Sequence, residues 1–207
     1  MEASVAANRA YHHGDLRAAL IEASFGLLAE CGLQRFSVAA VARRLQVSSA
    51  APYRHFPGRD HLLSAVSTTA ARDLRAEIVA ASDAAGPDPA DRLAATAGAY
   101  VRYVARTGAG FHVIFAAELY RLPDEERREH TRALITTLVE LAAATEARSY
   151  QESVQLVEAT IAVAHGYTSL YADGFFAQNA STADDIAARA VEAARNLITP
   201  GAIEVRN

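Results

Sequence analysis

Residues 48–55 combine small side chains with side chains that can bind phosphate. The small members are Ser48, Ser49, Ala50 and Ala51. Small residues let a helix approach the edges of bases in a groove of DNA, and an alanine methyl can contact the methyl group of thymine. The hydrogen-bonding members are Tyr53, Arg54 and His55. Their hydroxyl, guanidinium and imidazole groups can donate to phosphate oxygens, so the segment has the chemistry of a contact with duplex DNA.

The first element that must position this segment is a short helix that begins after Ser37. Serine is a favoured N-cap because its hydroxyl accepts a backbone N–H of the first turn. Apolar residues then recur with helical spacing, namely Val38, Val41, Ala42 and Leu45. This spacing directs Arg43 and Arg44 outward.

The second element is a short helix through Phe56, for which we prefer Ser49 to Ser48 as the N-cap. Pro52 then takes the third helical position, where a missing N–H costs little because that group has no partner within the helix. Two short helices joined by residues 46–48 and braced by a longer helix have the geometry of a helix-turn-helix, which presents its second helix to the major groove. Helix N-termini at Ser37 and Ser49 would add affinity for phosphate.

Charge is distributed unevenly along the chain. The net charge of the whole chain is -4, which on its own argues against a nucleic-acid partner. Residues 1–60 hold seven Arg and five acidic residues and carry +2, whereas the remainder holds thirteen Arg and nineteen acidic residues and carries -6. A basic head of this kind can meet phosphate. From spacing alone, the alternative that Arg43, Arg44 and Arg54 form an ordinary solvated face stays equally open.

Helical periodicity runs through the chain, and alternation typical of strands is nowhere sustained. We therefore predict an all-α fold of nine helices. Hydrophobic residues make up 51% of the chain, enough for a sizeable core. The predicted helices span about residues 15–30, 37–45, 49–56, 59–82, 88–107, 111–119, 124–141, 149–171 and 182–198. Gly32 is expected in a left-handed conformation after the first of them, and Thr182 with Asp185 forms a near capping box at the last.

The segments Tyr11–Leu16, Gln46–Phe56 and Arg59–Leu63 resemble the DNA-binding domain of the TetR family of bacterial transcriptional regulators. The shared pattern is Val-Ser, a few variable residues, Tyr-x-His-Phe, and a basic residue before an acid and Leu-Leu. It covers roughly the first quarter of the chain. The resemblance implies an all-helical dimer, commonly of nine helices, and in most members a repressor that a small molecule releases from its operator.

The resemblance also implies roles for individual residues. Ser37 matches a phosphate-contacting helix start, Ser48 to Ala51 match the base-reading region, and Tyr53 and His55 match phosphate contacts. Phe56 is implied to lie in the core, and Arg59 stands where the family usually has Lys.

The sequence departs from the family pattern at two positions. Gln46 stands where glycine is usual, so the turn is either strained, at a cost of about 1 kcal/mol, or closed differently. Pro52 stands where an aliphatic residue is commoner.

The C-terminal two-thirds holds a candidate small-molecule site around the Gly108–Gly110 break. Aromatic and apolar residues with a few polar groups are what such a site requires. The candidates are Tyr100, Tyr103, Val104, Phe111, His112, Phe115, Leu119, Leu138 and His165. Ordinary core packing is the alternative for each residue taken singly.

Residues 164–167 and 172–174 resemble the His-Gly motif of one TetR C-terminal subgroup, although the Trp of that motif is absent. Gly166 is expected to permit close approach of another helix. For His165, a satisfied core histidine and a ligand contact both stay open.

Other chemistries find little support in the sequence. Cys31 is the single cysteine, so an internal disulfide and a CxxC site are excluded. Glu126 and His130 share a helix face, but no second pair answers them as a di-iron bundle would require. The phosphate-cradle and nucleophile-elbow motifs do not occur, so we assign no catalytic residue, metal or cofactor. Without a long apolar run or a secretory signal, we expect a cytoplasmic protein with no membrane partner.

These observations predict a dimeric DNA-binding transcriptional regulator rather than an enzyme. We expect it to repress from a palindromic site on double-stranded DNA and to be released by a small apolar or amphipathic effector. The predicted domains are 1–57, the helix-turn-helix domain, and 58–207, the ligand-binding and dimerisation domain. A homodimer is expected through the last two helices. The alternative is a helical small-molecule sensor or carrier whose head does not bind DNA.

Overall fold

The computed structural model describes residues 15–146 and 149–199, and the Tyr11–Gly14 part of the motif lies outside them. In these ranges the chain is all-α and contains no strand. Its eight α-helices are α1 (Leu16–Arg35), α2 (Val38–Arg44), α3 (Arg59–Ala84), α4 (Pro89–Thr107), α5 (Phe111–Ile114), α6 (Glu125–Ala143), α7 (Tyr150–Ala172) and α8 (Ala183–Ile198). Three short 3₁₀ helices are η1 (Pro52–Arg54), η2 (Ala117–Arg121) and η3 (Ala177–Asn179).

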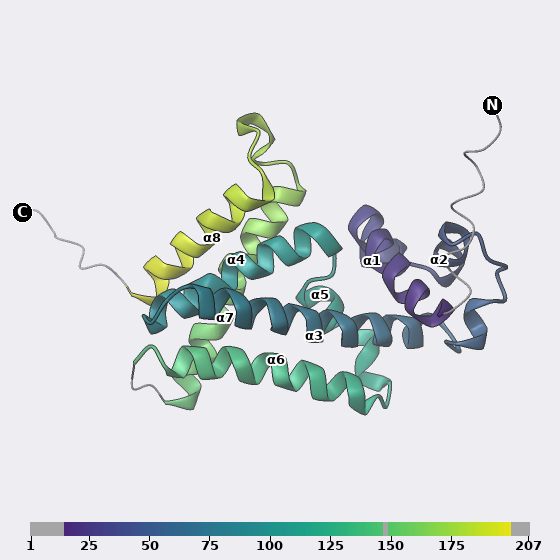
Figure 1. Ribbon diagram of the computed structural model, residues 1–207, viewed down its shortest axis with the longest axis horizontal. Coiled ribbons are helices and arrows are strands. Elements are labelled where there is room, and N and C mark those ends of the chain that lie inside the picture. Colours follow the sequence, from purple (N-terminus) through teal and green to yellow (C-terminus); the bar gives the residue numbers. More distant parts are fainter. Residues whose placement is uncertain (1–14, 147–148, 200–207) are drawn as a thin grey trace, which may run out of the picture.

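The head, formed by α1, α2 and η1, lies at one end of the molecule, and the remaining helices form a larger body (Figure 1). Helix α3 leaves the head and runs along the body beside α6. With 26 residues, α3 is about 39 Å long. Helix α4 lies in the centre of the body and packs against α3, α7 and α8. None of the helices in the described ranges combines the length and apolar character that crossing a bilayer requires.

Side-chain caps set where most of the helices begin, although α3, the longest, has none. Asp15, Ser37 and Asp88 each accept a backbone N–H from the first turn of the helix that follows. Thr182 and Asp185 form the predicted capping box at the start of α8, and α7 begins with an equivalent box at Ser149. These local signals explain why the predicted starts of the corresponding helices agree with the structure.

The prediction of nine helices was wrong by one, because the predicted helix from Ser49 to Phe56 is reduced to the 3₁₀ turn η1. Ser49 does not cap it: Ala51 holds the cap position, and Pro52 is the first residue of the turn rather than the third. Proline has no N–H to donate to the Ser48 carbonyl. That carbonyl instead accepts the Ala51 N–H at 3.0 Å, which tightens the turn.

The predicted helix 111–119 is divided into α5 and η2. Ala116 between them has an extended backbone, with ψ of 128°. The buried Ser67 hydroxyl of α3 donates to the Ile114 carbonyl at 2.9 Å and so satisfies this oxygen from outside the helix. The break therefore leaves no unpaired carbonyl at Ile114.

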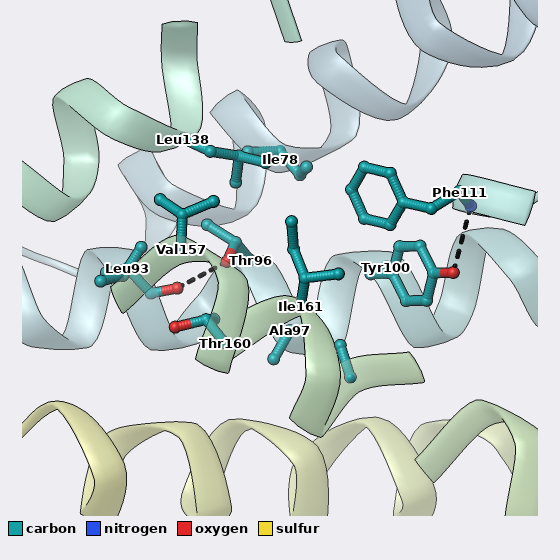
Figure 2. A pocket seen from close by; sticks show the side chains of 11 residues that line it. Ile78, Leu93, Thr96, Ala97, Tyr100, Phe111, Leu138, Val157, Thr160 and Ile161 are labelled. Atoms are coloured by element: carbon teal, nitrogen blue, oxygen red, sulfur yellow. Dashed lines mark hydrogen bonds between the residues drawn. The ribbon is translucent and has the colours of Figure 1, made fainter. Parts of the chain in front are cut away.

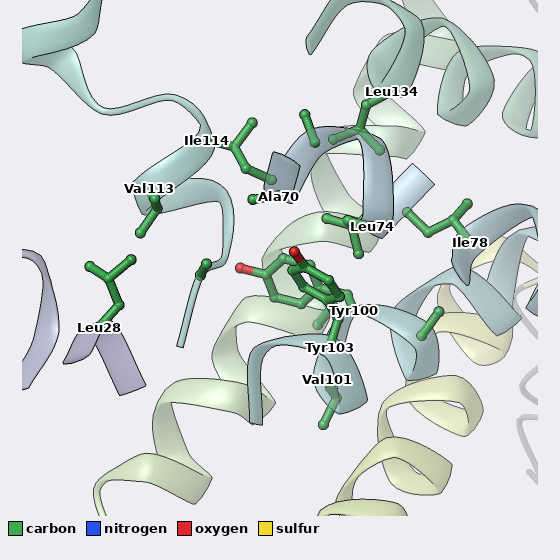
Figure 3. Close-up of a cluster of buried hydrophobic side chains, with 14 of the residues drawn as sticks. Leu28, Ala70, Leu74, Ile78, Tyr100, Val101, Tyr103, Val113, Ile114 and Leu134 are labelled. Atoms are coloured by element: carbon green, nitrogen blue, oxygen red, sulfur yellow. The ribbon is translucent and has the colours of Figure 1, made fainter. Parts of the chain in front are cut away.

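The body core is built from side chains of α3 and α4 and is closed by neighbouring helices (Figure 3). Leu74 and Ile78 of α3 and Tyr100 and Tyr103 of α4 are all at most 2% exposed. Leu28 of α1 belongs to the same continuous cluster. The head is thus joined to the body by apolar packing as well as by α3.

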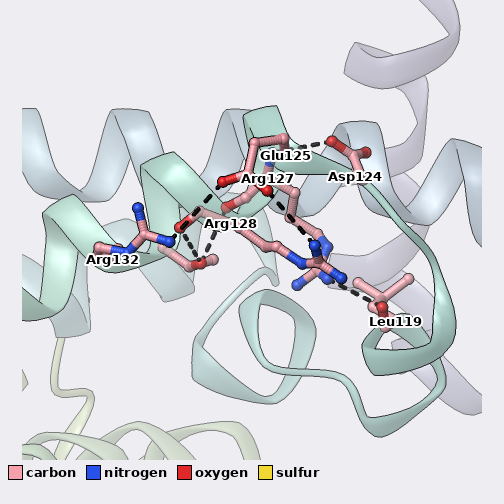
Figure 4. A network of polar contacts seen from close by, with 7 residues as sticks. Leu119, Asp124, Glu125, Arg127, Arg128 and Arg132 are labelled. Carbon is pink, nitrogen blue, oxygen red and sulfur yellow. Dashed lines mark hydrogen bonds and ion pairs between the residues drawn. The ribbon is translucent and has the colours of Figure 1, made fainter.

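A buried arginine fixes the segment between η2 and α6 (Figure 4). Arg127 is 4% exposed, and its guanidinium donates to the Leu119 carbonyl at 3.0 Å. Asp124 caps α6 and also accepts the Ser64 hydroxyl of α3 at 2.7 Å. Together these contacts tie η2 and α6 to α3.

Candidate nucleic-acid interface and ligand cavity

The outward face of the head carries most of the predicted DNA-contacting residues. Exposed members are Arg43, Ser48, Ser49, Ala50, Tyr53, Arg54 and His55, while Ser37 and Ala51 are half-buried. Tyr53 is 55% exposed, so its hydroxyl is accessible to a partner. The small and polar residues of this contiguous segment are therefore accessible to a partner.

Buried residues on the inner side hold η1 in place. Pro52 and Phe56 are both buried, Phe56 with 3% exposure. The Arg17 guanidinium of α1 lies 5.4 Å from the centre of the Phe56 ring, within the range of a cation–π contact. Because Pro52 and Phe56 face inward, Tyr53 and Arg54 between them face solvent.

The turn after α2 is closed by a left-handed glutamine. Gln46 has φ of 56°. Its N–H bonds to the Arg43 carbonyl and the Val47 N–H bonds to the Ala42 carbonyl, both at 3.1 Å. This pair of bonds is a Schellman motif, in which glycine is usual at the left-handed position. Of the two alternatives for Gln46, the strained turn is therefore the one observed.

The arginines of the head differ in how they are engaged. Arg44 pairs with Glu30 of α1 and lies over Gly26. Within the described ranges, Arg43 and Arg54 make no ion pair. Their charges are thus not neutralised by neighbouring carboxylates and can attract phosphate.

Arg59, which the resemblance placed among the DNA contacts, is engaged within the protein. Its guanidinium donates to the Phe36 carbonyl at 3.2 Å, the Leu33 carbonyl at 3.1 Å and the Glu118 carboxylate at 3.0 Å. It also lies over the Phe36 ring. Since these contacts use its donors to join the head to η2 in the body, we leave Arg59 out of the DNA-contacting set proposed below.

A second junction between head and body is formed by the end of α4. Gly108 caps α4 in a left-handed conformation, with φ of 65°. A Cβ at this position would lie 2.3 Å from the Ala29 backbone nitrogen and 2.6 Å from the Leu28 carbonyl carbon of α1. Only glycine allows the α4 terminus to lie this close to α1.

A small cavity lies in the body between α3, α4, α6 and α7 (Figure 2). The volume of this cavity is about 10 Å³, which is about enough for one water molecule. The lining side chains are Ile78, Leu93, Thr96, Ala97, Tyr100, Phe111, Leu138, Val157, Thr160, Ile161 and Ala164. All are uncharged, and most are apolar.

The predicted ligand residues divide into two groups. Tyr100, Phe111 and Leu138 line the cavity. The others do not: Tyr103, Val104, His112, Phe115, Leu119 and His165. Tyr103 and Leu119 are fully buried core residues, in agreement with the alternative of ordinary packing.

Sequence reasoning missed the small and branched residues that form most of the lining. Residues 93, 96, 97 and 100 on α4 and residues 157, 160, 161 and 164 on α7 share the spacing i, i+3, i+4, i+7. Each set is one face of its helix. This periodicity was a readable signal, but it does not reveal that the two faces oppose each other.

A polar cluster of Tyr100, His112 and His165 lies next to the cavity, which Tyr100 also lines. The Tyr100 hydroxyl accepts the Phe111 N–H at 3.2 Å and lies 3.0 Å from Nδ1 of His165. Burial raises the pKa of Tyr100 to about 12, so its proton is retained. Partial burial and the neighbouring His165 lower the pKa of His112, against the opposing effect of the Gly108 carbonyl.

Metal chemistry finds no suitable cluster in the part of the chain that the structure describes. No group of three or more His, Cys, Asp or Glu side chains is placed there to hold an ion. Cys31, the free cysteine, donates to the Leu27 carbonyl of its own helix.

Two family models match the chain. Residues 20–66 match the model of bacterial regulatory proteins of the tetR family. Residues 93–194 match the model of a tetracyclin repressor-like C-terminal domain. Between them, the models cover both the head and most of the body. No curated protein matches the chain.

Solved structures share the fold at low sequence identity. A protein with unknown function from Rhodococcus sp. RHA1 is 24% identical, with a TM-score of 0.68 over 91% of this chain and 97% of that one. A TetR-family transcriptional regulator from Streptomyces coelicolor is 18% identical, with a TM-score of 0.62 over 88% and 93%. A TetR variant from Acinetobacter baumannii in complex with minocycline is 17% identical, with a TM-score of 0.60 over 88% and 94%.

Proposed function

Because the chain belongs to the TetR family of bacterial regulatory proteins, we propose that it is a dimeric repressor released from a palindromic operator by a small apolar or amphipathic effector. Proteins of this family are transcriptional regulators rather than enzymes, with an N-terminal DNA-binding domain and a C-terminal ligand-binding domain. We assign residues 1–57 to the first and 58–207 to the second, with the boundary at the turn that precedes α3.

The observation that carries the proposal is the accessible segment from Ser48 to His55. It presents small residues to base edges and hydrogen-bond donors to phosphate, next to the unpaired charge of Arg43. In a dimer, two such segments would enter successive major grooves about 34 to 36 Å apart.

The proposed dimer forms through α7 and α8, packed as a four-helix bundle with their mates. One side of α7 carries the small residues Ala159, Ala162, Gly166 and Ser169, of which Ala162 is exposed and the others are half-buried. Glu158 and His165 are exposed beside them. A Cβ placed on Gly166 would meet no atom within 4 Å. Small side chains on an open helix face allow a second helix to approach closely.

Helix α3 connects the proposed ligand site to the proposed DNA site. Ile78 of α3 lines the cavity, and Arg59 at the start of α3 holds the head. An effector that widened the cavity would tilt α3 and change the separation of the two heads. Each state would then bind the operator with a different affinity, which is the coupling that induction requires.

The DNA contacts can be tested by a gel shift with duplex DNA from upstream of the gene. Tyr53→Phe with His55→Ala removes two hydrogen-bond donors and should weaken binding about tenfold or more. Arg54→Gln should also make binding less dependent on salt. The slope of log affinity against log salt concentration should decrease in magnitude by about one for each phosphate contact that is lost. Tyr120→Phe, which alters an exposed tyrosine in the body, is the matched control.

Unchanged affinity in both head variants would contradict the interface. No binding by the wild-type protein to its upstream DNA, together with binding of small molecules, would instead favour the alternative of a sensor or carrier with an inactive head.

A further inference from the structure

Extending the proposed function and resting on it, we infer that the effector is a neutral, largely apolar molecule that carries one hydrogen-bond donor and no ionised group. The inference comes from the polar atoms of the cavity wall. Only three lining side chains are polar, namely Thr96, Tyr100 and Thr160, and none of the lining side chains is charged.

The two threonine hydroxyls can accept a hydrogen bond but have no proton to offer a ligand. Thr96 donates to the Leu93 carbonyl at 2.7 Å, and Thr160 donates to the Leu156 carbonyl at 2.8 Å. A hydroxyl has a single proton and two acceptor lone pairs. Each threonine is therefore satisfied as a donor and can receive only an O–H or N–H of a bound molecule.

The tyrosine hydroxyl is turned away from the cavity. It points along the bond to the Phe111 N–H, so only the ring of Tyr100 faces the other lining residues (Figure 2). His165 lies within hydrogen-bonding distance of the same hydroxyl. Neither His112 nor His165 lines the cavity, and His165 is exposed. The polar cluster of Tyr100, His112 and His165 therefore does not form a head-group site of the cavity.

An ionised ligand would lose its hydration without compensation in this cavity. Burial of a charge is costly unless the charge is paired and hydrogen-bonded. A carboxylate would find no donor on the threonines, and an ammonium would find acceptors but no counter-charge. A single neutral donor, by contrast, would be satisfied by Thr96 or Thr160 while the remainder of the molecule contacts apolar side chains.

The cavity must widen for such a ligand to enter, since its volume holds about one water. The smallest lining side chains, Ala97 on α4 and Ala164 on α7, lie on facing helices. Separation of α4 from α7 at these residues would create room without displacing a large side chain.

Matched pairs of probes that differ only in charge test the ligand class. Para-ethylbenzamide, which carries an N–H donor, and para-ethylbenzoate form one isosteric pair, and para-ethylbenzyl alcohol and para-ethylbenzylammonium form another. Para-ethylphenol and para-ethyltoluene test the hydrogen bond. Dissociation constants are measured by calorimetry with the full-length protein near pH 7.5, where the acid and the amine are ionised.

We expect each neutral member to bind at least about tenfold more tightly than its ion. The phenol should bind about threefold or more tighter than the toluene. Thr96→Val with Thr160→Val should abolish the preference for the phenol. Thr168→Val is the matched control. Thr168 is buried on α7, as Thr160 is, and its hydroxyl donates to the Ala164 carbonyl, but it does not line the cavity. Ala164→Leu should fill the cavity and abolish binding of every probe.

Equal or tighter binding of either ion would overturn the inference. So would failure of every neutral probe to bind at millimolar concentration, or binding that Ala164→Leu leaves unchanged. The gel shift without probe, repeated for each variant, shows whether the fold and DNA binding persist. A wild-type protein that shifts DNA but does not prefer the neutral probes to the ions would count against the effector class alone, whereas a wild-type protein that does not shift DNA would count against the proposed function.

Discussion

Gln46 occupies the left-handed position after α2 with an exposed side chain, so the turn and not a side-chain contact imposes its conformation. A non-glycine residue in this conformation costs about 1 to 2 kcal/mol, partly offset because glycine loses more entropy on folding. We expect Gln46→Gly to raise the free energy of unfolding by about 0.5 kcal/mol and Gln46→Val to lower it by about 1 kcal/mol. Urea denaturation measures both. Any order of stability other than Gly, Gln, Val would contradict the strained turn.

His112 should make stability depend on pH. Its lowered pKa, caused by partial burial and by His165, means that folding favours the neutral imidazole. The unfolded chain then binds more protons as the pH falls through the ordinary histidine range, so stability decreases on acidification. Between about pH 7.5 and 5.5, the fall in Tm should be smaller for His112→Gln than for the wild-type protein. An equal fall in both proteins would remove His112 as a source of the dependence.

Residues 52–56 show what could be predicted from single residues and what could not. The sequence placed Tyr53, Arg54 and His55 on the outward side and Phe56 in the core, and their exposure agrees. It did not predict that Pro52 would begin a 3₁₀ turn, because Pro52 was expected at the third position of a helix capped by Ser49. Because Pro52 has no N–H, the Ser48 carbonyl accepts the Ala51 N–H instead. This change of partner becomes visible only when each backbone hydrogen bond is assigned.

At the scale of elements, the contact of α4 with α1 depends on Gly108. Gly108→Ala would strain the left-handed backbone and place a methyl against the α1 backbone. We expect it to lower the free energy of unfolding by about 2 kcal/mol or more and to weaken DNA binding, because the head must shift.

Gly174→Ala is the matched control for this substitution. Gly174 also has a left-handed backbone, with φ of 77°, but a Cβ there would meet nothing within 4 Å. Its cost should be limited to about 1 kcal/mol, with DNA binding unchanged. Thermal unfolding and gel shifts distinguish the two variants. Equal effects of both on DNA binding would show that the junction does not position the head.

The starts of helices were predictable because caps are local, as Ser37, Asp88 and Thr182 illustrate. The cavity was not predictable, since it depends on which faces of α4 and α7 oppose each other. Those faces are separated by more than fifty residues of chain, and periodicity within one helix carries no information about its partner. The contact of Arg59 with Glu118 was not predictable for the same reason, because Glu118 is distant in sequence.

At the scale of the whole molecule, the proposed dimer places α7 against its mate. Ala162→Glu would bring two carboxylates into the small-residue face, where burial of unpaired charge is unfavourable. We expect the wild-type protein to sediment as a dimer at micromolar concentration and the variant as a monomer with strongly reduced operator affinity. Ala105→Glu, on an exposed position of α4, is the control. A monomeric wild-type protein would contradict the proposed assembly.

The hydrogen bonds of Arg59 to two backbone carbonyls and one carboxylate also matter for the design of chimeric regulators that combine the head of one protein with the body of another. Carbonyl groups are available in any related head, whereas the carboxylate of Glu118 belongs to the body. A chimera in which another head replaces the first 57 residues therefore keeps these hydrogen bonds, because Arg59 and Glu118 remain in the body. The new head must also supply an α1 whose backbone fits against Gly108. Compatibility of donor and recipient can thus be judged from two short stretches before any chimera is made.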